Sequence, residues 1–175
     1  MTNPLTEMTL KHVKPGMKIL DLGCGAGKFA VSAADLGGVV TAVDKKLPKL
    51  PNVWMDSRVM WLNMGAAEFL EAFGPSSVGS GLMFDIIYAR NCIQFMPKAW
   101  VLEILLPALQ AMLNPGGTIF IETFYQPPEP PFAKDHPSHY TAKDLLDSAA
   151  GLQPVFFDET KRENQSLDGS GPRLF

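Results

Sequence analysis

Three glycines at alternate positions, Gly23, Gly25 and Gly27, stand where one apolar run meets another. The first run, Met17 to Leu22, is typical of a buried strand, and the second, Lys28 to Leu36, is typical of a helix. Because glycine has no Cβ, its backbone can adopt positive φ and lie in van der Waals contact with a ligand. A strand that leads through such a turn into a helix N-terminus favours the binding of a nucleotide-like ligand.

A second candidate contact for such a ligand is Asp44, which follows the apolar run Val39 to Val43. That run is rich in β-branched residues and predicts a second buried strand. An acidic side chain at the end of this strand can accept hydrogen bonds from both hydroxyls of a ribose. The dinucleotide fingerprint G-x-G-x-x-G, however, requires glycine at position 28, where this chain has Lys28. The pattern therefore favours a ribose-containing ligand other than a dinucleotide.

Strand-like and helix-like segments alternate along the rest of the chain. Strands are expected at residues 17–22, 39–43, 59–62, 84–89, 118–123 and 153–158, and a seventh could open at 173–175. Helices are expected at residues 4–13, 27–36, 66–73, 98–113 and 142–150, with Asn3 capping the first, Thr141 capping the last and Pro107 kinking the fourth. Residues 114–117 are expected to form a turn. Residues 125–140, which hold five prolines, are expected to form a loop of the kind that often covers a site.

This alternation predicts an α/β fold with a mostly parallel sheet and helices on both faces. Ligands of such sheets bind outside the carboxyl ends of the strands, near the point where the strand order reverses. The glycine turn, Asp44 and the polar segment from Arg90 to Phe95 are therefore expected around one crevice.

Composition limits the function classes. The 175 residues, of which 46% are hydrophobic and 19% charged, fit one globular domain covering residues 1–175. A formal net charge of −3 argues against a large phosphate-binding surface, so no nucleic-acid partner is expected. No apolar stretch approaches the ~20 residues of a membrane span, and the amino terminus is polar, so we expect a cytoplasmic protein without a membrane partner. Cys24 and Cys92 lie far apart, without the spacing of a metal site or a disulfide framework.

Four motifs in order resemble those of the class I S-adenosylmethionine-dependent methyltransferases. The segments that carry the resemblance are Leu20 to Gly27, Val40 to Asp44, Phe84 to Asn91 and Leu113 to Thr118. The stretch from Glu122 through Leu146 is in addition similar to the small methyltransferases related to tellurite-resistance proteins.

The resemblance implies a three-layer, Rossmann-like methyltransferase fold of about seven strands, with an antiparallel last strand that is short here. It implies that Asp21 and the backbone of the glycine turn hold the methionine part of S-adenosylmethionine, that Asp44 holds the ribose, and that Asn91 lies near the sulfonium. The family often has an acidic residue after the third strand that contacts the adenine. This chain has none, so Gly65, Ala66 or the Asn63 side chain would substitute. The expected cofactor contacts are Asp21, Gly23, Cys24, Gly25, Gly27, Asp44, Lys45, Gly65, Ala66, Arg90 and Asn91.

The acceptor implied by the resemblance is a small molecule. Methyl transfer is an in-line displacement, in which a nucleophile must be held roughly 3–3.5 Å from the methyl carbon and water excluded. A general base is needed only if that nucleophile carries a proton, so we assign no catalytic residue and no metal. Candidate acceptor contacts are Gln94, Tyr125, His136, His139 and Tyr140, although His136 and His139 also fit polar residues on the surface of a loop.

Two alternatives stay open. One is a non-catalytic cofactor-binding protein on the same fold, which the missing adenine acid would permit. The other is an NAD(P)-dependent oxidoreductase, against which stand Lys28 and the absence of a Tyr-x-x-x-Lys pattern in the sequence.

Overall fold

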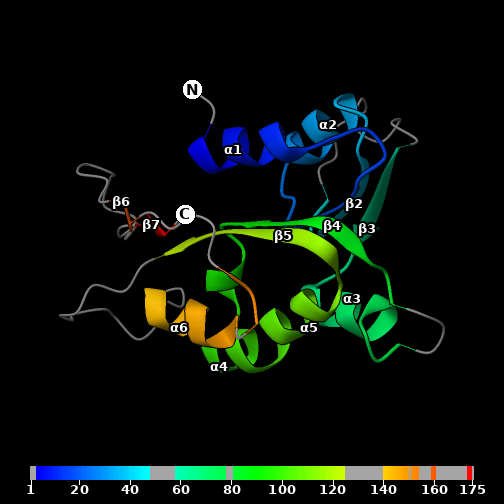
Figure 1. Ribbon diagram of the computed structural model, residues 1–175. Helices are drawn as coiled ribbons and strands as arrows, with labels where there is room; N and C mark the ends of the chain where they lie inside the picture. Colours follow the sequence, from blue (N-terminus) through cyan, green and yellow to red (C-terminus); the bar gives the residue numbers. More distant parts are fainter. Residues whose placement is uncertain are drawn as a thin grey trace.

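A seven-stranded sheet with the order β3-β2-β1-β4-β5-β7-β6 forms the middle layer (Figure 1). The computed structural model describes residues 3–47, 58–77, 81–124, 140–149, 151–153, 159–160 and 173–174. Its strands are β1 (Lys18–Leu22), β2 (Val39–Asp44), β3 (Val59–Asn63), β4 (Phe84–Arg90), β5 (Leu113–Phe124), β6 (Glu159–Thr160) and β7 (Arg173–Leu174). Its helices are α1 (Pro4–His12), α2 (Lys28–Asp35), α3 (Ala66–Phe73), α4 (Lys98–Trp100), α5 (Leu106–Ala111) and α6 (Ala142–Ser148), with a 3₁₀ turn η1 (Ile93–Phe95) and a π-helical turn η2 (Val101–Leu105).

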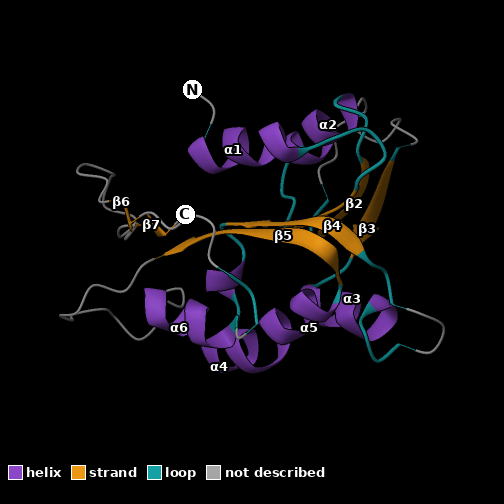
Figure 2. Ribbon diagram, in the orientation of Figure 1, coloured by secondary structure: helices purple, strands orange, loops and turns teal. Residues whose placement is uncertain are grey.

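Five strands, from β3 to β5, are parallel, while β7 runs antiparallel to β5 and β6 antiparallel to β7. Helices α1 and α2 cover one face of the sheet, and α3, α4, α5 and α6 cover the other (Figures 1 and 2). This arrangement confirms the expected α/β fold with a short antiparallel last strand. The strand order reverses between β1 and β4, so a crevice is expected at their carboxyl ends.

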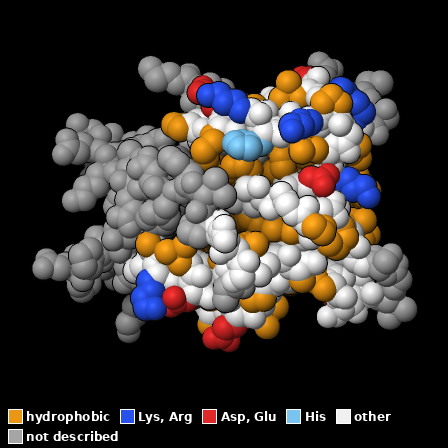
Figure 3. All heavy atoms as spheres, in the orientation of Figure 1, with side chains coloured by type: hydrophobic (Ala, Val, Ile, Leu, Met, Phe, Trp, Pro, Cys, Tyr) orange, Lys and Arg blue, Asp and Glu red, His pale blue; other side chains and the backbone are white. Residues whose placement is uncertain are grey.

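The central strands are apolar because both of their faces are covered. Successive side chains of a strand point to opposite faces, so β1 sends Leu20 and Leu22 toward α3 and α5 and Ile19 toward α2. Phe69 of α3 and Phe29 of α2 lie in these two buried clusters, one on each side of the sheet. In the view of Figure 3, hydrophobic side chains lie between the two helix layers and charged side chains of both signs lie around them.

The first helix begins as predicted. Asn3 Oδ1 accepts a hydrogen bond from Thr6 N at 3.2 Å, and Pro4, which needs no hydrogen-bond acceptor, occupies the first turn. In the part of the chain that the structure describes, no helix is long and apolar enough to cross a membrane.

The single kinked helix predicted over 98–113 is wrong in detail, because the structure divides it into α4, η2 and α5. Pro107 has no N–H, so the α-helical hydrogen bond that it would donate is missing. The neighbouring Leu106 N–H bonds to Val101 O, one residue farther back than in an α-helix. The expected irregularity at the proline therefore takes the form of a π-helical turn before it.

The turn predicted at 114–117 lies within β5. Phe84 pairs with Leu113, but Ile86 pairs with Thr118, so four residues of β5 face the single Asp85. The Asp85 carboxylate holds this bulge, because it accepts from Asn114 Nδ2 at 2.8 Å and from Lys18 N at 2.8 Å. The predicted turn is thus a four-residue bulge within β5, after which the strand continues.

The sixth strand was expected at 153–158. The structure places β6 at Glu159–Thr160, with Gln153 outside any strand and 154–158 outside the described residues. Pairing with β7 sets this position, since Glu159 faces Leu174 and Thr160 faces Arg173. Gln153 is the one described residue of the predicted range, so the strand at 154–158 stays a prediction.

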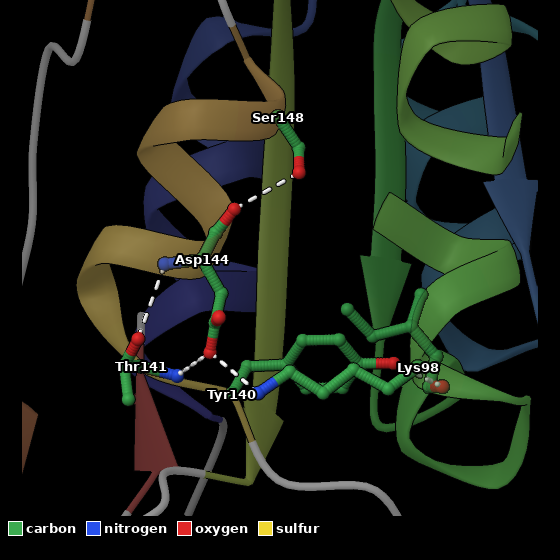
Figure 4. A network of polar contacts seen from close by, with 6 residues as sticks. Lys98, Tyr140, Thr141, Asp144 and Ser148 are labelled. Atoms are coloured by element: carbon green, nitrogen blue, oxygen red, sulfur yellow. Dashed lines mark hydrogen bonds and ion pairs between the residues drawn. The ribbon is translucent and has the colours of Figure 1, made fainter. Parts of the chain in front are cut away.

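Helix α6 is anchored at its N-terminus by a capping box (Figure 4). Thr141 Oγ1 accepts from Asp144 N at 3.1 Å, and Asp144 Oδ2 accepts from Thr141 N and Lys98 Nζ, both at 2.7 Å. Tyr140, whose ring lies 5.7 Å from Lys98 Nζ, donates from its hydroxyl to Ile93 O at 3.1 Å. These contacts join α6 to the segment that follows β4.

Replacing Thr141 with alanine should lower the free energy of unfolding by about 1 kcal/mol, because it removes the cap of α6. Urea denaturation followed by circular dichroism measures this change. Ser148→Ala is a matched control on the same helix: its hydroxyl bonds back to Asp144 O at 2.9 Å, a contact that adds little to helix stability. Equal losses in the two variants would contradict the importance of the cap.

Candidate functional site

A pocket of about 840 Å³ opens at the carboxyl ends of β1, β2 and β4. It lies where the reversal of strand order predicts a crevice. The residues that line it are Asp21, Leu22, Gly23, Cys24, Gly25, Ala26, Lys28, Phe29, Val43, Asp44, Lys45, Lys46, Met64, Gly65, Ala66, Tyr88, Arg90, Asn91, Cys92, Phe95 and Met96. Among the expected cofactor contacts, the structure therefore brings all but Gly27 to one pocket.

The glycine turn has the geometry that its sequence predicts. Gly23, Gly25 and Gly27 have φ of 71°, 51° and 71°. A Cβ at Gly23 would lie 2.3 Å from Cys92 Cβ, so only glycine fits there. A Cβ at Gly25 would meet no protein atom within 4 Å, because that side of the turn is exposed and borders the pocket.

The turn is held by hydrogen bonds within the protein. Gly23 N and Cys24 N donate to Val43 O at 2.8 and 3.1 Å, and Gly27 N donates to Cys24 O at 2.8 Å. Gly25 N donates to Asp44 Oδ2 at 2.9 Å. The end of β1 is thereby tied to the end of β2, and four N–H groups of the turn are used internally.

Asp44 lies at the end of β2 beside this turn. Its second oxygen, Oδ1, accepts from Lys46 N at 2.8 Å. An ionised carboxylate can accept about four hydrogen bonds, so about two positions remain for a ligand. Two neighbouring hydroxyls, such as those of a ribose, would fill them.

Asp21 is a carboxyl group buried in the floor of the pocket. It is 2% exposed, and its Oδ2 atom has no hydrogen-bond partner among the described residues. Burial raises the pKa of Asp21 to about 7; a hydrogen bond from the Ala30 backbone opposes this shift, the charge of Asp44 adds to it and that of Arg90 opposes it. A buried acceptor without a partner is rare in folded proteins, so the Asp21 side chain fits a ligand that donates hydrogen bonds.

Arg90 is the last residue of β4 and Asn91 follows it, and both line the pocket. Asn91 has φ of 52°, a left-handed conformation that asparagine adopts more readily than most residues. Its backbone N–H donates to Glu122 O at 2.8 Å, and its buried Oδ1 has no hydrogen-bond partner in the described part of the chain. Arg90 Nε lies 3.5 Å from Oε2 of Glu122.

The third wall is the N-terminus of α3. Met64, Gly65 and Ala66 line the pocket there, whereas Asn63 does not. Gly65 N donates to Glu68 Oε2 at 2.6 Å, so the capping box of α3 uses this amide. Of the adenine contacts considered from the sequence, the structure thus favours Gly65 and Ala66.

The two candidate acceptor contacts that the structure describes do not line this pocket. Gln94 and Tyr140 are buried, at 1% and 0% exposure, and neither lines the pocket. Gln94 Oε1 accepts from Thr123 Oγ1 at 3.4 Å, and Tyr140 bonds to Ile93 O. Tyr125, His136 and His139 lie outside the described residues.

Several lining residues were missed from the sequence. Phe29 was not among the expected site residues, but its ring stacks on Tyr88 with centroids 3.8 Å apart, and both rings line the pocket. Phe95 lines the rim and is 65% exposed. The alternation of β4 could have identified Tyr88, since it lies on the same face as Arg90. Lys28, Lys46, Met64 and Met96 also line the pocket and were not among the expected contacts.

The two thiols in the pocket wall do not resemble activated nucleophiles. Burial raises the pKa of Cys92 to about 12, with the charges of Asp21 and Asp44 adding to the shift, and burial likewise raises that of Cys24. Both thiols are therefore protonated near neutral pH. Among the described residues, no cluster of His, Cys, Asp and Glu could hold a metal ion.

The sequence is similar to known methyltransferases. A ubiquinone biosynthesis O-methyltransferase of Xanthomonas campestris is 31% identical over 123 residues, which cover 65% of this chain and 46% of that protein. A ribosomal protein L11 methyltransferase of Nitratiruptor is 30% identical over 111 residues, covering 63% of this chain and 36% of that protein. The chain thus spans about half, or less, of the length of the curated relatives it matches.

Solved structures share the fold. The 1,6-didemethyltoxoflavin-N1-methyltransferase of Burkholderia thailandensis, solved with 1,6-didemethyltoxoflavin and S-adenosylhomocysteine, matches with a TM-score of 0.70 and 21% identity over 98% of this chain and 74% of that one. TehB of Haemophilus influenzae matches with a TM-score of 0.74 and 16% identity over 99% and 60%. These likenesses confirm the Rossmann-like methyltransferase fold.

A family model described as a methyltransferase domain matches residues 3–155, which is most of the chain. With the fold and the sequence relatives in agreement, this protein belongs to the methyltransferase domain family.

Proposed function

We propose that this protein transfers the methyl group of S-adenosylmethionine to a small-molecule acceptor. The observation that carries the proposal is one pocket that joins the glycine turn, the partly engaged Asp44 carboxylate and two buried oxygen atoms, on Asp21 and Asn91, that have no hydrogen-bond partner among the described residues. S-adenosylmethionine offers donors of the matching kinds, namely two ribose hydroxyls and an ammonium group.

The residues of the pocket have distinct parts in this proposal. Asp44 would accept from the ribose hydroxyls and Asp21 from the ammonium group, while the open side of Gly25 permits close approach of the ligand backbone. When bound, S-adenosylmethionine supplies a methyl carbon already activated by positively charged sulfur. The acceptor then needs positioning more than it needs a catalytic side chain.

The proposed reaction balances in electrons and charge without a catalytic side chain. The acceptor's electron pair forms the new bond to carbon, the carbon–sulfur bond breaks, and its electrons neutralise the sulfur. An acceptor that is already deprotonated releases no proton, so no base is required for it. The apolar rim at Phe95 and Met96 would help to exclude water.

The proposal extends to the partners. The net charge of −3 supports an acceptor other than a nucleic acid. Two cysteines far apart in the sequence, Cys24 and Cys92, fit a reducing, cytoplasmic location. The curated relatives include an O-methyltransferase of ubiquinone biosynthesis, whose acceptor is a small molecule.

A methyl-transfer assay tests the proposal. The protein is incubated with methyl-labelled S-adenosylmethionine and a panel of thiol, metalloid, amine and carboxylate acceptors. We expect labelled product and stoichiometric S-adenosylhomocysteine with at least one acceptor. Cofactor binding without transfer to any of them would instead favour the non-catalytic alternative.

Asp44→Ala should weaken S-adenosylhomocysteine binding roughly tenfold to a hundredfold, since it removes charged hydrogen bonds to the ribose. Isothermal titration calorimetry measures the affinity. Asp147→Ala removes an exposed carboxylate on α6 and serves as the control, with no change expected. Unchanged affinity in Asp44→Ala would contradict the assignment of the ribose site.

A further inference from the structure

Arg90 differs from the other cations that line the pocket. Lys28, Lys45 and Lys46 are exposed, whereas the Arg90 side chain is 38% exposed and has a buried Nε. It projects from the last residue of β4, a strand at the centre of the sheet. A rigid base and partial burial make it the cation of this set with the best-defined position.

Glu122 lies beside one edge of the Arg90 guanidinium as its ion-pair partner. The two residues are register partners on β4 and β5, and Glu122 is fully buried. The distance of 3.5 Å between Nε and Oε2 is longer than a strong charged hydrogen bond. The guanidinium also hydrogen-bonds to the Tyr88 side chain. Because a guanidinium has five donors in a planar fork, donors remain for a ligand.

Four N–H groups of the glycine turn are already hydrogen-bonded within the protein. Backbone N–H groups at such turns commonly bind anions. Here the N–H groups of Gly23, Cys24, Gly25 and Gly27 all donate to oxygen atoms of the protein. A carboxylate in this pocket would therefore not bind to these four amides.

We propose that Arg90, positioned by the buried Glu122, binds a ligand carboxylate in this pocket. The inference rests on the proposed function. The planar fork matches a carboxylate in shape and charge, whereas the exposed lysines offer only solvated point charges. The carboxylate comes either from the amino-acid part of S-adenosylmethionine or from the methyl acceptor.

The test compares ligands that differ only in the carboxylate. S-adenosylhomocysteine and its decarboxylated analogue, S-adenosyl-3-thiopropylamine, are titrated into the wild type and into the double variant Arg90→Gln/Glu122→Gln. The double variant replaces both charges together, so no unpaired charge stays buried. Benzoate and its uncharged isostere benzamide are titrated into the S-adenosylhomocysteine complex of each protein.

If the cofactor supplies the carboxylate, the double variant should bind S-adenosylhomocysteine roughly tenfold to a hundredfold more weakly. Its affinity for the decarboxylated analogue should stay within about twofold of the wild type. If the acceptor supplies the carboxylate, both adenosyl ligands should bind unchanged, while benzoate binding is lost and benzamide binds neither protein. Either result supports Arg90 as the carboxylate site.

A purely structural pair gives a different result. The melting temperature of the double variant would then differ from that of the wild type, while its affinities for both adenosyl ligands and for benzoate would be unchanged. That result would overturn the inference. Lys143→Gln/Asp147→Asn, which removes an exposed ion pair on α6, controls for the loss of one charge of each sign. Failure of the wild type to bind either adenosyl ligand would overturn the proposed function itself, and this inference with it.

Discussion

Replacing Gly23 with alanine should destabilise the protein by about 2–5 kcal/mol, a large part of the stability of an ordinary domain. Two costs add. The left-handed φ of 71° costs a non-glycine residue about 1–2 kcal/mol. The new Cβ would also lie 2.3 Å from Cys92 Cβ, and relieving that overlap adds about 1–3 kcal/mol.

Gly25 and Gly16 provide matched controls, because both have positive φ and neither would have a protein atom within 4 Å of a new Cβ. Gly25→Ala and Gly16→Ala should each cost about 1–2 kcal/mol, the price of the backbone conformation alone. Urea denaturation measures all three variants. Equal losses at Gly23 and Gly25 would contradict the close approach of the turn to Cys92.

The same pair separates folding from binding. Gly25→Ala should remain folded and yet lose most of its affinity for S-adenosylhomocysteine, because its methyl group would occupy the side of the turn that borders the pocket. Gly16→Ala should bind as the wild type does. Calorimetric titration of the two variants checks this difference.

Asp21→Asn should stabilise the ligand-free protein at pH 8, by up to about 4 kcal/mol if the full pKa shift is expressed. The pKa of Asp21 is raised from 3.8 to about 7, mainly by burial, so the folded state holds this proton more tightly than the unfolded state. The stability of the wild type should therefore fall as the pH rises from about 4 to about 7 and change little beyond. Asparagine is neutral throughout and removes this dependence.

Thermal unfolding at pH 5 and pH 8 tests the Asp21 prediction. The advantage of Asp21→Asn over the wild type should be less than half as large at pH 5 as at pH 8, while the exposed Asp147→Asn shows no such pattern. S-adenosylhomocysteine should bind Asp21→Asn more weakly at pH 8, because the variant lacks the carboxylate that pairs with the ligand ammonium. A variant less stable than the wild type at both pH values would contradict the account of this residue.

The sequence was a sound guide wherever local chemistry decides the structure. The strand, turn and helix around the glycine motif follow from apolar runs and from glycines that tolerate positive φ, and α3 begins and ends at the predicted residues. Asp44 was placed at the ligand site because β2 had to end there. These features depend on residues within one or two turns of chain.

The features that were missed depend on contacts between distant segments. The bulge in β5 is held by the Asp85 side chain of β4. Gln94 was expected to face an acceptor, but the fold buries it against Thr123. The pairing of Arg90 with Glu122 requires the register of β4 against β5, which no spacing along the chain reports.

The central claim is that the pocket beside the glycine turn holds S-adenosylmethionine. A crystal structure of the protein soaked with S-adenosylhomocysteine tests it most directly. We expect the ribose hydroxyls to lie within hydrogen-bonding distance of the Asp44 carboxylate. The homocysteine part should pass Gly25 and extend toward Asp21 and Asn91. A ligand bound elsewhere, or one whose ribose does not contact Asp44, would contradict it.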